Sequence, residues 1–218
     1  MKIDLLTLYY PNYSSLGDCV LSNWIEYCNK HGYGLNAYIG HYGFDASIPL
    51  GFHKTKFVYD QLFNNPDAPD AALVLDLDIM ITNMEIQVGA FLGGHPNANM
   101  ILTADVNGVN SGSYVIRRND GAKQLLEYML GDISNFTCEQ NTIKERPDNQ
   151  IVKDNVEVLE HPSINSYLYE SYPEFSHHAA TNPGQWKPGH FLLHLPGMSL
   201  ERRLGIFQSE KIQSAIIR

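Results

Sequence analysis

The sequence is poor in cysteine, in basic residues and in long apolar runs, and each shortage excludes a class of protein. Its three cysteines, Cys19, Cys28 and Cys138, are too few and too scattered for a disulfide framework or a zinc site, which favours a reducing compartment. Lys and Arg number 15 against 24 Asp and Glu, and the net charge of -9 argues against a nucleic acid or an anionic membrane as partner. No signal-peptide core and no apolar stretch of about 18 residues is present, so we expect a cytoplasmic chain without a membrane anchor.

The composition that remains is that of a globular protein. Hydrophobic residues make up 44% of the chain and charged residues 18%, which is enough apolar material for a real core. We expect a single domain over residues 1–218, which can belong to a longer polypeptide. Its residues up to about 155 are regular in pattern, and the remainder is irregular and rich in Tyr, Pro and His.

Strand and helix patterns alternate through the first half. The spacing of apolar residues predicts strands over 3–9, 34–39 and 71–81, and helices over 14–31 and 54–63. Further strands are expected over 99–104, 113–116 and 191–195, with helices starting after Asn119 and near Ser199. Strand-helix-strand order predicts parallel pairing, and hence an open α/β sheet with its ligand crevice at the carboxyl ends of the strands.

The third predicted strand, LVLDLDIMIT, contains two aspartates one residue apart. Alternation along a strand predicts that Asp76 and Asp78 project from one face, about 7 Å apart. Two such carboxylates repel each other unless a cation compensates, and hard oxygen ligands suit Mg²⁺ or, with a histidine, Mn²⁺. The pattern fits equally well two aspartates that end a strand and cap a turn.

Four segments carry a resemblance to a known family: FHKTKFVYDQLFNNPDAPDAALVLDLDIMI, NSGSYVIRRND, DNQIVKDN and GQWKPGHFLLHLPG. In order and spacing they resemble segments of nucleotide-sugar-dependent glycosyltransferases with the GT-A fold. The nearest pattern is that of the galactosyl and xylosyl transferases of glycosyltransferase family 34, with kinship to the glycogenin-like family 8. The resemblance therefore implies a Rossmann-like GT-A fold, with an open, mixed and mostly parallel central sheet flanked by helices.

The resemblance also assigns roles to individual residues. It implies a metal site formed by Asp78 and His194, with Asp76 sharing the ion or bonding the ribose, and Leu77 and Gly197 beside the nucleotide. It places Thr7 and Tyr9 at the uracil, and Lys56 and Arg202 at the diphosphate. The donor sugar would meet Asn110, Ser111 and Gly112, together with the candidate catalytic residues Asp105, Asp148 and Gln150.

Several of these residues have an alternative interpretation from the sequence alone. Thr7, Tyr9 and His194 also fit core positions, and Arg202 fits a solvated charge. Asp148 can instead cap a helix. Four aromatic residues of the irregular segment can stack on an acceptor sugar or pack in the core: Tyr167, Tyr169, Tyr172 and Trp186.

The implied activity is transfer of a hexosyl or deoxyhexosyl unit from a UDP-sugar, with Mn²⁺ or Mg²⁺, to a glycan or glycoprotein. Retention of anomeric configuration is expected, since no residue stands out as the base that inversion needs. The pattern is also similar to that of capsid-glycosylating enzymes of chloroviruses, which implies a capsid glycoprotein as acceptor and the host-cell cytoplasm as location.

Three other classes remain open: a sugar-nucleotide nucleotidyltransferase, a metal-dependent phosphohydrolase and a non-catalytic sugar-binding domain. The first calls for a Gly-rich phosphate loop, which TLYYPNYSSLGD does not contain. A phosphohydrolase would be expected to carry more His and Asp ligands near strand ends. Donor sugar, acceptor and linkage are not determined by the sequence.

Overall fold

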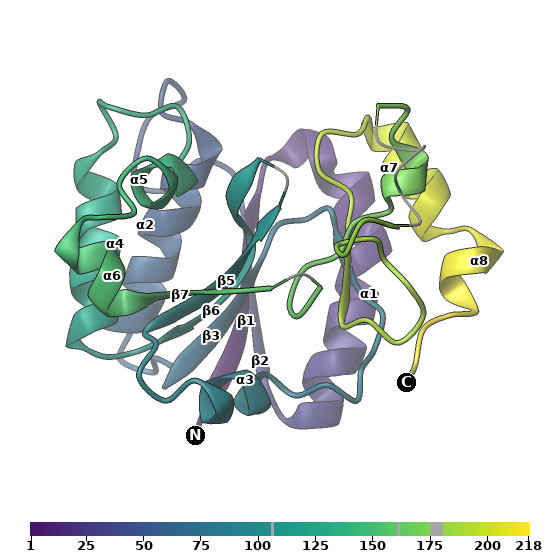
Figure 1. Ribbon diagram of the computed structural model, residues 1–218, viewed down its shortest axis with the longest axis horizontal. Helices are drawn as coiled ribbons and strands as arrows, with labels where there is room; N and C mark the ends of the chain where they lie inside the picture. The colour runs from purple at the N-terminus through teal and green to yellow at the C-terminus, as the bar shows by residue number, and fades with distance from the viewer. Residues whose placement is uncertain (106, 161, 175–180) are drawn as a thin grey trace.

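The computed structural model describes residues 1–105, 107–160, 162–174 and 181–218, and all structural statements concern those residues. The tandem histidines His177 and His178, which the sequence suggests are surface or loop residues, lie outside the described residues. In the described part, no helix has the length and apolar character needed to cross a membrane. Figure 1 shows a central sheet with helical layers on both sides.

The central sheet has six strands in the order β2-β1-β3-β6-β5-β7. Strand β1 pairs in parallel with β2 and β3, and β7 pairs in parallel with β5, whereas β6 runs antiparallel to both of its neighbours. The predicted mixed, mostly parallel sheet is therefore confirmed. Its strands are β1 (Ile3–Tyr9), β2 (Gly34–Ile39), β3 (Ala71–Leu75), β5 (Met100–Asp105), β6 (Gly108–Arg117) and β7 (Val156–Leu159).

Helices cover the two faces of this sheet and bury two hydrophobic cores. On one face lies α1 (Ser14–His31), ended by Gly32 in the left-handed conformation as its position predicts. Side chains alternate along β1, so Leu5 packs on the α1 side while Leu6 packs on the opposite side. The opposite layer contains α2 (Leu50–Phe63), α4 (Asp120–Gly131), α5 (Gln140–Lys144) and α6 (Gln150–Asn155) (Figure 1).

The prediction of one continuous strand over 71–81 is wrong in one respect, because a turn at the two aspartates divides it into two strands. Strand β3 ends at Leu75, and Ile79–Ile81 form β4, which pairs antiparallel with β8 (Leu192–His194) in a separate two-stranded sheet. Asp76, Leu77 and Asp78 form the turn between the two sheets. The two carboxylates thus come together through a turn and not through strand alternation.

The other boundaries differ less from prediction. Helix α2 starts at Leu50, four residues before the predicted start at Lys54. Asn119 caps α4 as predicted by accepting from the Ala122 amide, but Gly131 is the last helical residue and Asp132 is the cap. The single helix expected near 199–216 is two helices, α7 (Leu200–Phe207) and α8 (Glu210–Gln213). The remaining elements are α3 (Val88–Gly94), η1 (Pro11–Tyr13) and η2 (Tyr169–Ser171).

Candidate active site

A cavity of about 290 Å³, here called the first cavity, opens where β1 and β3 end. This is the edge at which an open α/β sheet binds ligands. Leu8 and Tyr9 contribute from β1, Tyr13 from η1, and Asp76 to Asp78 from the turn after β3. The opposite wall comes from α2, β6 and the start of α5, with Lys54, Ser111, Glu139 and Gln140.

Three potential metal ligands converge at the base of this cavity. Asp76, Asp78 and His194 each offer a ligand atom, and these atoms all lie within 4.8 Å of one another. The register of β4 against β8 creates the convergence, because Ile79 lies opposite His194 and the Leu195 amide donates to the Asp78 carbonyl. Asp78 and His194 are buried, whereas the Asp76 side chain is 39% exposed at the cavity.

The donor set fits a divalent cation. Two ligand atoms about 2.1 Å from one ion, at right angles, lie about 3.0 Å apart, and Nε2 of His194 is 3.2 Å from Oδ1 of Asp78. Two carboxylates with one imidazole suit Mn²⁺. Two cations, Lys54 and Arg203, face three carboxylates, Asp76, Asp78 and Glu139, so the cluster keeps one uncompensated negative charge when histidine is neutral.

Lys54 is a buried ammonium group with three close partners. Its Nζ lies 2.7 Å from Oδ1 of Asp76, 3.2 Å from Oε1 of Glu139 and 3.0 Å from the Ser111 carbonyl oxygen. Burial alone would lower the pKa of Lys54, but Asp76 and Glu139 raise it well above its ordinary value. Lys54 thus donates to Asp76 and to the Ser111 carbonyl and forms an ion pair with Glu139, so it holds the cavity wall together and directs Asp76.

Glu139 lies on the other side of this lysine, also buried. Its Oε1 accepts from the Ser111 hydroxyl at 2.6 Å. Burial opposes ionisation, but Lys54 and this hydrogen bond keep the pKa of Glu139 below its ordinary value. Gly51 permits the packing, because a Cβ atom there would lie 1.6 Å from Oε2 of Glu139.

Arg203 of α7 completes the base of the cavity. Its Nη2 lies 2.6 Å from Oδ2 of Asp78, and its Nε donates to the Leu195 carbonyl oxygen at 3.0 Å. Burial opposes the ionisation of Asp78, yet His194, when its imidazole is protonated, and Arg203 lower the pKa of Asp78 below its ordinary value. Arg203 uses Oδ2 of Asp78 and His194 faces Oδ1, so an ion at Oδ1 leaves the arginine pair intact.

A second cavity, of about 300 Å³, adjoins the first and shares Gln140 with it. Tyr167, Tyr169 and Tyr172 line it, together with two carboxylates, Asp105 and Glu174. Burial and the neighbouring Asp105 raise the pKa of Tyr167 and of Tyr169, so this cavity presents neutral hydroxyls. Trp186 is instead a core residue, buried and bonded through its indole N–H to the Thr82 hydroxyl.

The structure brings most of the predicted site residues to these two cavities. Tyr9, Leu77 and Ser111 line the first cavity together with Asp76 and Asp78, and Asp105, Asn110 and Gly197 line the second. Gly112 lies directly against His194, since a Cβ atom there would be 2.4 Å from Cε1 of the imidazole. Thr7 is fully buried within β1 and lines neither cavity.

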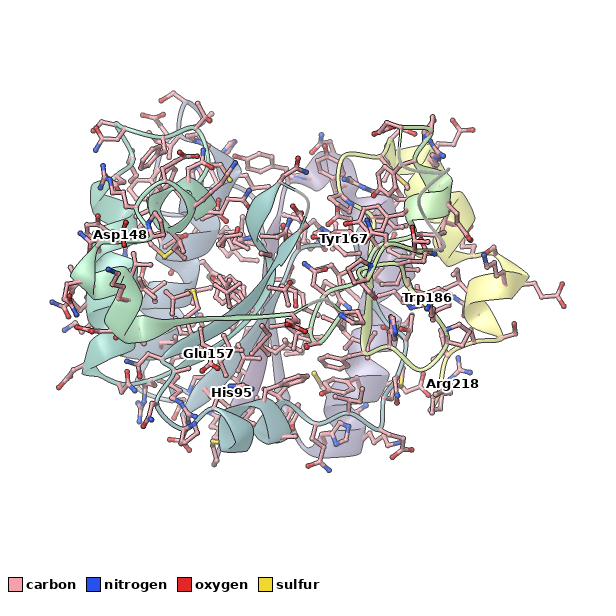
Figure 2. All side chains as sticks on the ribbon, in the orientation of Figure 1. His95, Asp148, Glu157, Tyr167, Trp186 and Arg218 are labelled. Carbon is pink, nitrogen blue, oxygen red and sulfur yellow. The ribbon has the colours of Figure 1, made fainter. Side chains whose placement is uncertain are left out.

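Four predicted residues lie elsewhere. Lys56 pairs with Asp60 one turn along α2, and the exposed Arg202 guanidinium donates to the Ser171 carbonyl. Asp148 is 92% exposed and pairs with Lys153, at the outer edge of the helical layer in Figure 2, and Gln150 donates to Asp154. Arg203 and Lys54 occupy the cavity in place of the two predicted cations.

Glu139 and Gln140 were missed by the sequence reasoning, although a signal for them exists. They are an adjacent acidic-Gln pair, which is similar to the Asp-Asn-Gln segment that contains Asp148 and Gln150. The structure places the earlier of these two acidic-Gln segments at the cavities because α5 packs against β6.

No protein-family model matches the chain, and no curated protein matches it in sequence. Its fold is that of solved glycosyltransferases. A glycosyltransferase involved in the glycosylation of the major capsid of PBCV-1 superposes with a TM-score of 0.73 at 16% identity, over 95% of this chain and 99% of that one. The glycosyltransferase GlyE of Streptococcus pneumoniae TIGR4 superposes with a TM-score of 0.54 at 13% identity, over 97% of this chain and 64% of that one.

The galactosyltransferase LgtC, solved with donor and acceptor sugar analogues, gives a TM-score of 0.50 at 11% identity, over 97% of this chain and 99% of that one. The predicted GT-A fold is thereby confirmed at the level of architecture. Identities this low establish the fold, while the chemistry of this chain has to be argued from its own cavities.

Proposed function

We propose that this chain is a metal-dependent glycosyltransferase that moves a hexosyl or deoxyhexosyl unit from a UDP-sugar to a glycan acceptor, with retention of anomeric configuration. The observation that carries the proposal is the cluster of Asp76, Asp78 and His194 at the base of a cavity where β1 and β3 end. Such a cluster beside fixed cations suits a ligand that carries a diphosphate.

The metal would be held by Asp76, Asp78 and His194. When bound, it would neutralise negative charge that develops on the diphosphate leaving group. Arg203 would add a second positive charge at the same place, since its guanidinium lines the cavity beside Asp78. Lys54 would act indirectly by orienting Asp76 and by opposing the rise in the pKa of Asp76 that burial causes.

The two cavities would divide the substrates between them. The nucleotide would lie in the first cavity, with the base near Tyr9 and Tyr13, and the acceptor would lie among the tyrosines of the second. The donor sugar would lie between them, where Gln140 lines both. Residues up to about 155 would supply most of the nucleotide-sugar part, and residues from about 156 to 218 would supply the acceptor-side tyrosines and a closing segment that brings Arg203 to the first cavity.

In the transfer, the bond from the anomeric carbon to the diphosphate oxygen breaks, and its electron pair leaves with the diphosphate. The acceptor oxygen bonds to the same face of the anomeric carbon, and its proton passes to an oxygen of the leaving phosphate. Asp105 is a poor candidate for a dedicated base because it already accepts from Asn107, Tyr167 and Asn110. Inverted configuration in the product, measured by NMR, would contradict this part of the proposal.

A donor panel tests the proposal as a whole. The protein is incubated with Mn²⁺ and with UDP-glucose, UDP-galactose, UDP-xylose or UDP-rhamnose, and UDP release is measured with and without acceptor glycans. We expect one donor to give acceptor-stimulated release that EDTA abolishes and Mn²⁺ restores. Absence of release together with absence of Mn²⁺-dependent UDP binding would refute the activity and favour a sugar-binding module.

The acceptor can be approached in the same assay. The PBCV-1 enzyme with the same fold acts in glycosylation of a major capsid protein, so a deglycosylated viral capsid protein belongs in the acceptor panel beside free glycans. We propose a glycan or glycoprotein acceptor of this kind. Stimulation of UDP release by free monosaccharides alone would point instead to a small-molecule acceptor.

A further inference from the structure

Asn165 is a fully buried amide that joins the two cavities. Its Oδ1 lies 3.1 Å from Nδ1 of His194, and its Nδ2 lies 3.1 Å from both Oδ1 of Asn110 and the Tyr167 hydroxyl. One side of this amide thus contacts the metal cluster, and the other contacts residues that line the second cavity.

The directions of these hydrogen bonds follow from one backbone amide. The Gly112 N–H can only donate, and it donates to Oδ1 of Asn110 at 2.9 Å, which identifies that side-chain atom as oxygen. The Asn165 atom facing the same oxygen must then be its amide nitrogen, because two carbonyl oxygens would repel each other. The carbonyl oxygen of Asn165 is therefore the atom that faces His194.

Asp105 fixes the other end of this series of hydrogen bonds, and it gives the same donor-to-acceptor direction. Its ionised carboxylate can only accept, and Oδ2 receives bonds from the Tyr167 hydroxyl at 3.0 Å and from Nδ2 of Asn110 at 3.2 Å. The Tyr167 oxygen is then left to accept from Nδ2 of Asn165. Both anchors agree on the orientation of the Asn165 amide.

A single tautomer of neutral His194 satisfies this arrangement. Since the carbonyl of Asn165 accepts, Nδ1 of His194 must carry the proton, and Nε2 presents its lone pair. That lone pair faces Oδ1 of Asp78 at 3.2 Å. A bare nitrogen opposite a carboxylate oxygen is repulsive unless a cation lies between them, so the histidine is preset as a ligand.

We propose that Asn165 is a positioning residue that sets the Nδ1–H tautomer of His194 and so directs Nε2 toward a metal ion shared with Asp78. The metal itself rests on the proposed function, whereas the tautomer is a property of the protein alone. Asn165 acts through His194 and does not contact the ion. The same amide connects His194 to Tyr167, which lines the second cavity.

The first test reads the tautomer without metal or substrate. Long-range ¹H–¹⁵N NMR spectra at alkaline pH, where histidine is neutral, distinguish protonated Nδ1 from protonated Nε2, and loss of one signal set in His194→Gln assigns the residue. We expect Nδ1–H in the wild type and a mixture with Nε2–H in Asn165→Leu. A wild-type protein with Nε2–H would overturn the proposal, whatever the variants do.

Two further variants separate positioning from folding. Asn165→Asp keeps an acceptor for Nδ1, so Nδ1–H should persist although the bond to Asn110 is lost. Asn155→Leu removes another buried Asn side chain, one that bonds to Asn99 and Ile151 away from the cavities. It should lower stability and leave the His194 tautomer unchanged; a changed tautomer in this variant would show that general loosening, and not Asn165, sets the proton.

The second test measures Mn²⁺ affinity by electron paramagnetic resonance. Loss of a hydrogen bond behind a metal-bound histidine typically weakens metal binding 10- to 100-fold, and we expect a change of about that size for Asn165→Leu and little change for Asn155→Leu. Equal affinity in Asn165→Leu and wild type would refute positioning. If the wild type binds no Mn²⁺ yet shows Nδ1–H, the proposed function fails while the role of Asn165 in fixing the tautomer stands.

Discussion

The two cavities carry the same kind of charge but balance it in different ways. In the first cavity each carboxylate faces a cation: Asp76 and Glu139 face Lys54, and Asp78 faces Arg203. In the second cavity Asp105 is balanced by hydroxyl and amide donors, and its partners include Tyr167 and Asn110. The first arrangement suits a ligand with concentrated charge, such as a diphosphate with a metal ion. The second suits a neutral ligand with many hydroxyl groups.

The cavities also differ in the elements that build them. The first is made at the ends of strands and at the junction of two sheets, where backbone pairing fixes each side chain. The tyrosines of the second come from the irregular segment around η2. A difference of this kind predicts that changes in the first cavity affect stability and catalysis together, whereas changes in the second affect mainly the acceptor.

The largest effect is expected for Asp78→Asn. This change removes a ligand charge and leaves Arg203 without its counter-ion, and we expect kcat/KM to fall at least about 100-fold, as loss of a metal ligand should exceed loss of an outer hydrogen bond. Mn²⁺-dependent UDP release measures it. Asp148→Asn is the matched control on the exposed surface and should retain full activity. Full activity of Asp78→Asn would refute the metal assignment.

Substitution of Lys54 should lower the free energy of unfolding more than substitution of any surface lysine. Lys54→Met leaves two carboxylates without their cation, and breaking a buried pair typically costs about 3 to 5 kcal/mol. Lys56→Met on the same helix removes only a surface pair with Asp60, for which about 0.3 to 0.5 kcal/mol is expected. Urea unfolding of both variants measures the difference, and equal losses would contradict the distinction between the two lysines.

The same pair predicts a dependence on pH. Lys54 holds the pKa of Glu139 below its ordinary value of 4.5, so this contribution to folding is present above pH 4.5 and is lost as pH falls through the lowered pKa. In Lys54→Met burial alone would raise the pKa of Glu139. The loss of stability caused by a buried Glu139 carboxylate without a cation is then largest at neutral pH, and it decreases on acidification because Glu139 becomes protonated. The stability gap between wild type and variant should therefore narrow from pH 7 to pH 4 in urea unfolding. A gap of constant size would show that Glu139 does not depend on Lys54.

The smallest effect is expected at the rim of the second cavity. Glu174→Gln removes an exposed negative charge and should change KM for a neutral acceptor by less than about threefold, because exposed charges contribute little. Its effect should be larger for an anionic acceptor, such as a uronic-acid glycan, which the wild type repels. Initial rates with matched neutral and acidic acceptors measure both. A large change in donor KM would place Glu174 in the first cavity's function.

Local patterns were sufficient where one element decides the outcome. Helix α1 begins at Ser14 and ends at His31 as its apolar spacing and Gly32 predict, and the Asn119 cap was recognised from residue type alone. The end of β3 at Leu75 cannot be recognised from residue type, because buried apolar residues continue on both sides of the aspartates. Only the pairing of β4 with the distant β8 distinguishes two short strands from one long strand.

For the site residues, too, local patterns are sufficient only where the packing of one element against another does not decide the outcome. Asp76, Asp78 and His194 could be selected from the sequence, whereas the choice of Lys54 over Lys56 depends on how α2 is rotated against the cavity. Arg202 and Arg203 are adjacent on α7, and packing alone decides which of them reaches Asp78. The sequence therefore predicts the cluster of candidate ligands but not the cations that face it.

The junction between the two sheets has a consequence for the whole chain. Asp78 and His194 belong to segments that are far apart in sequence and adjacent in space, so an ion held by both would act as a reversible cross-link. Like a disulfide, such a link lowers the entropy of the unfolded chain, but its strength varies with the free ion concentration. The melting temperature of this protein should thus report how much metal its surroundings contain.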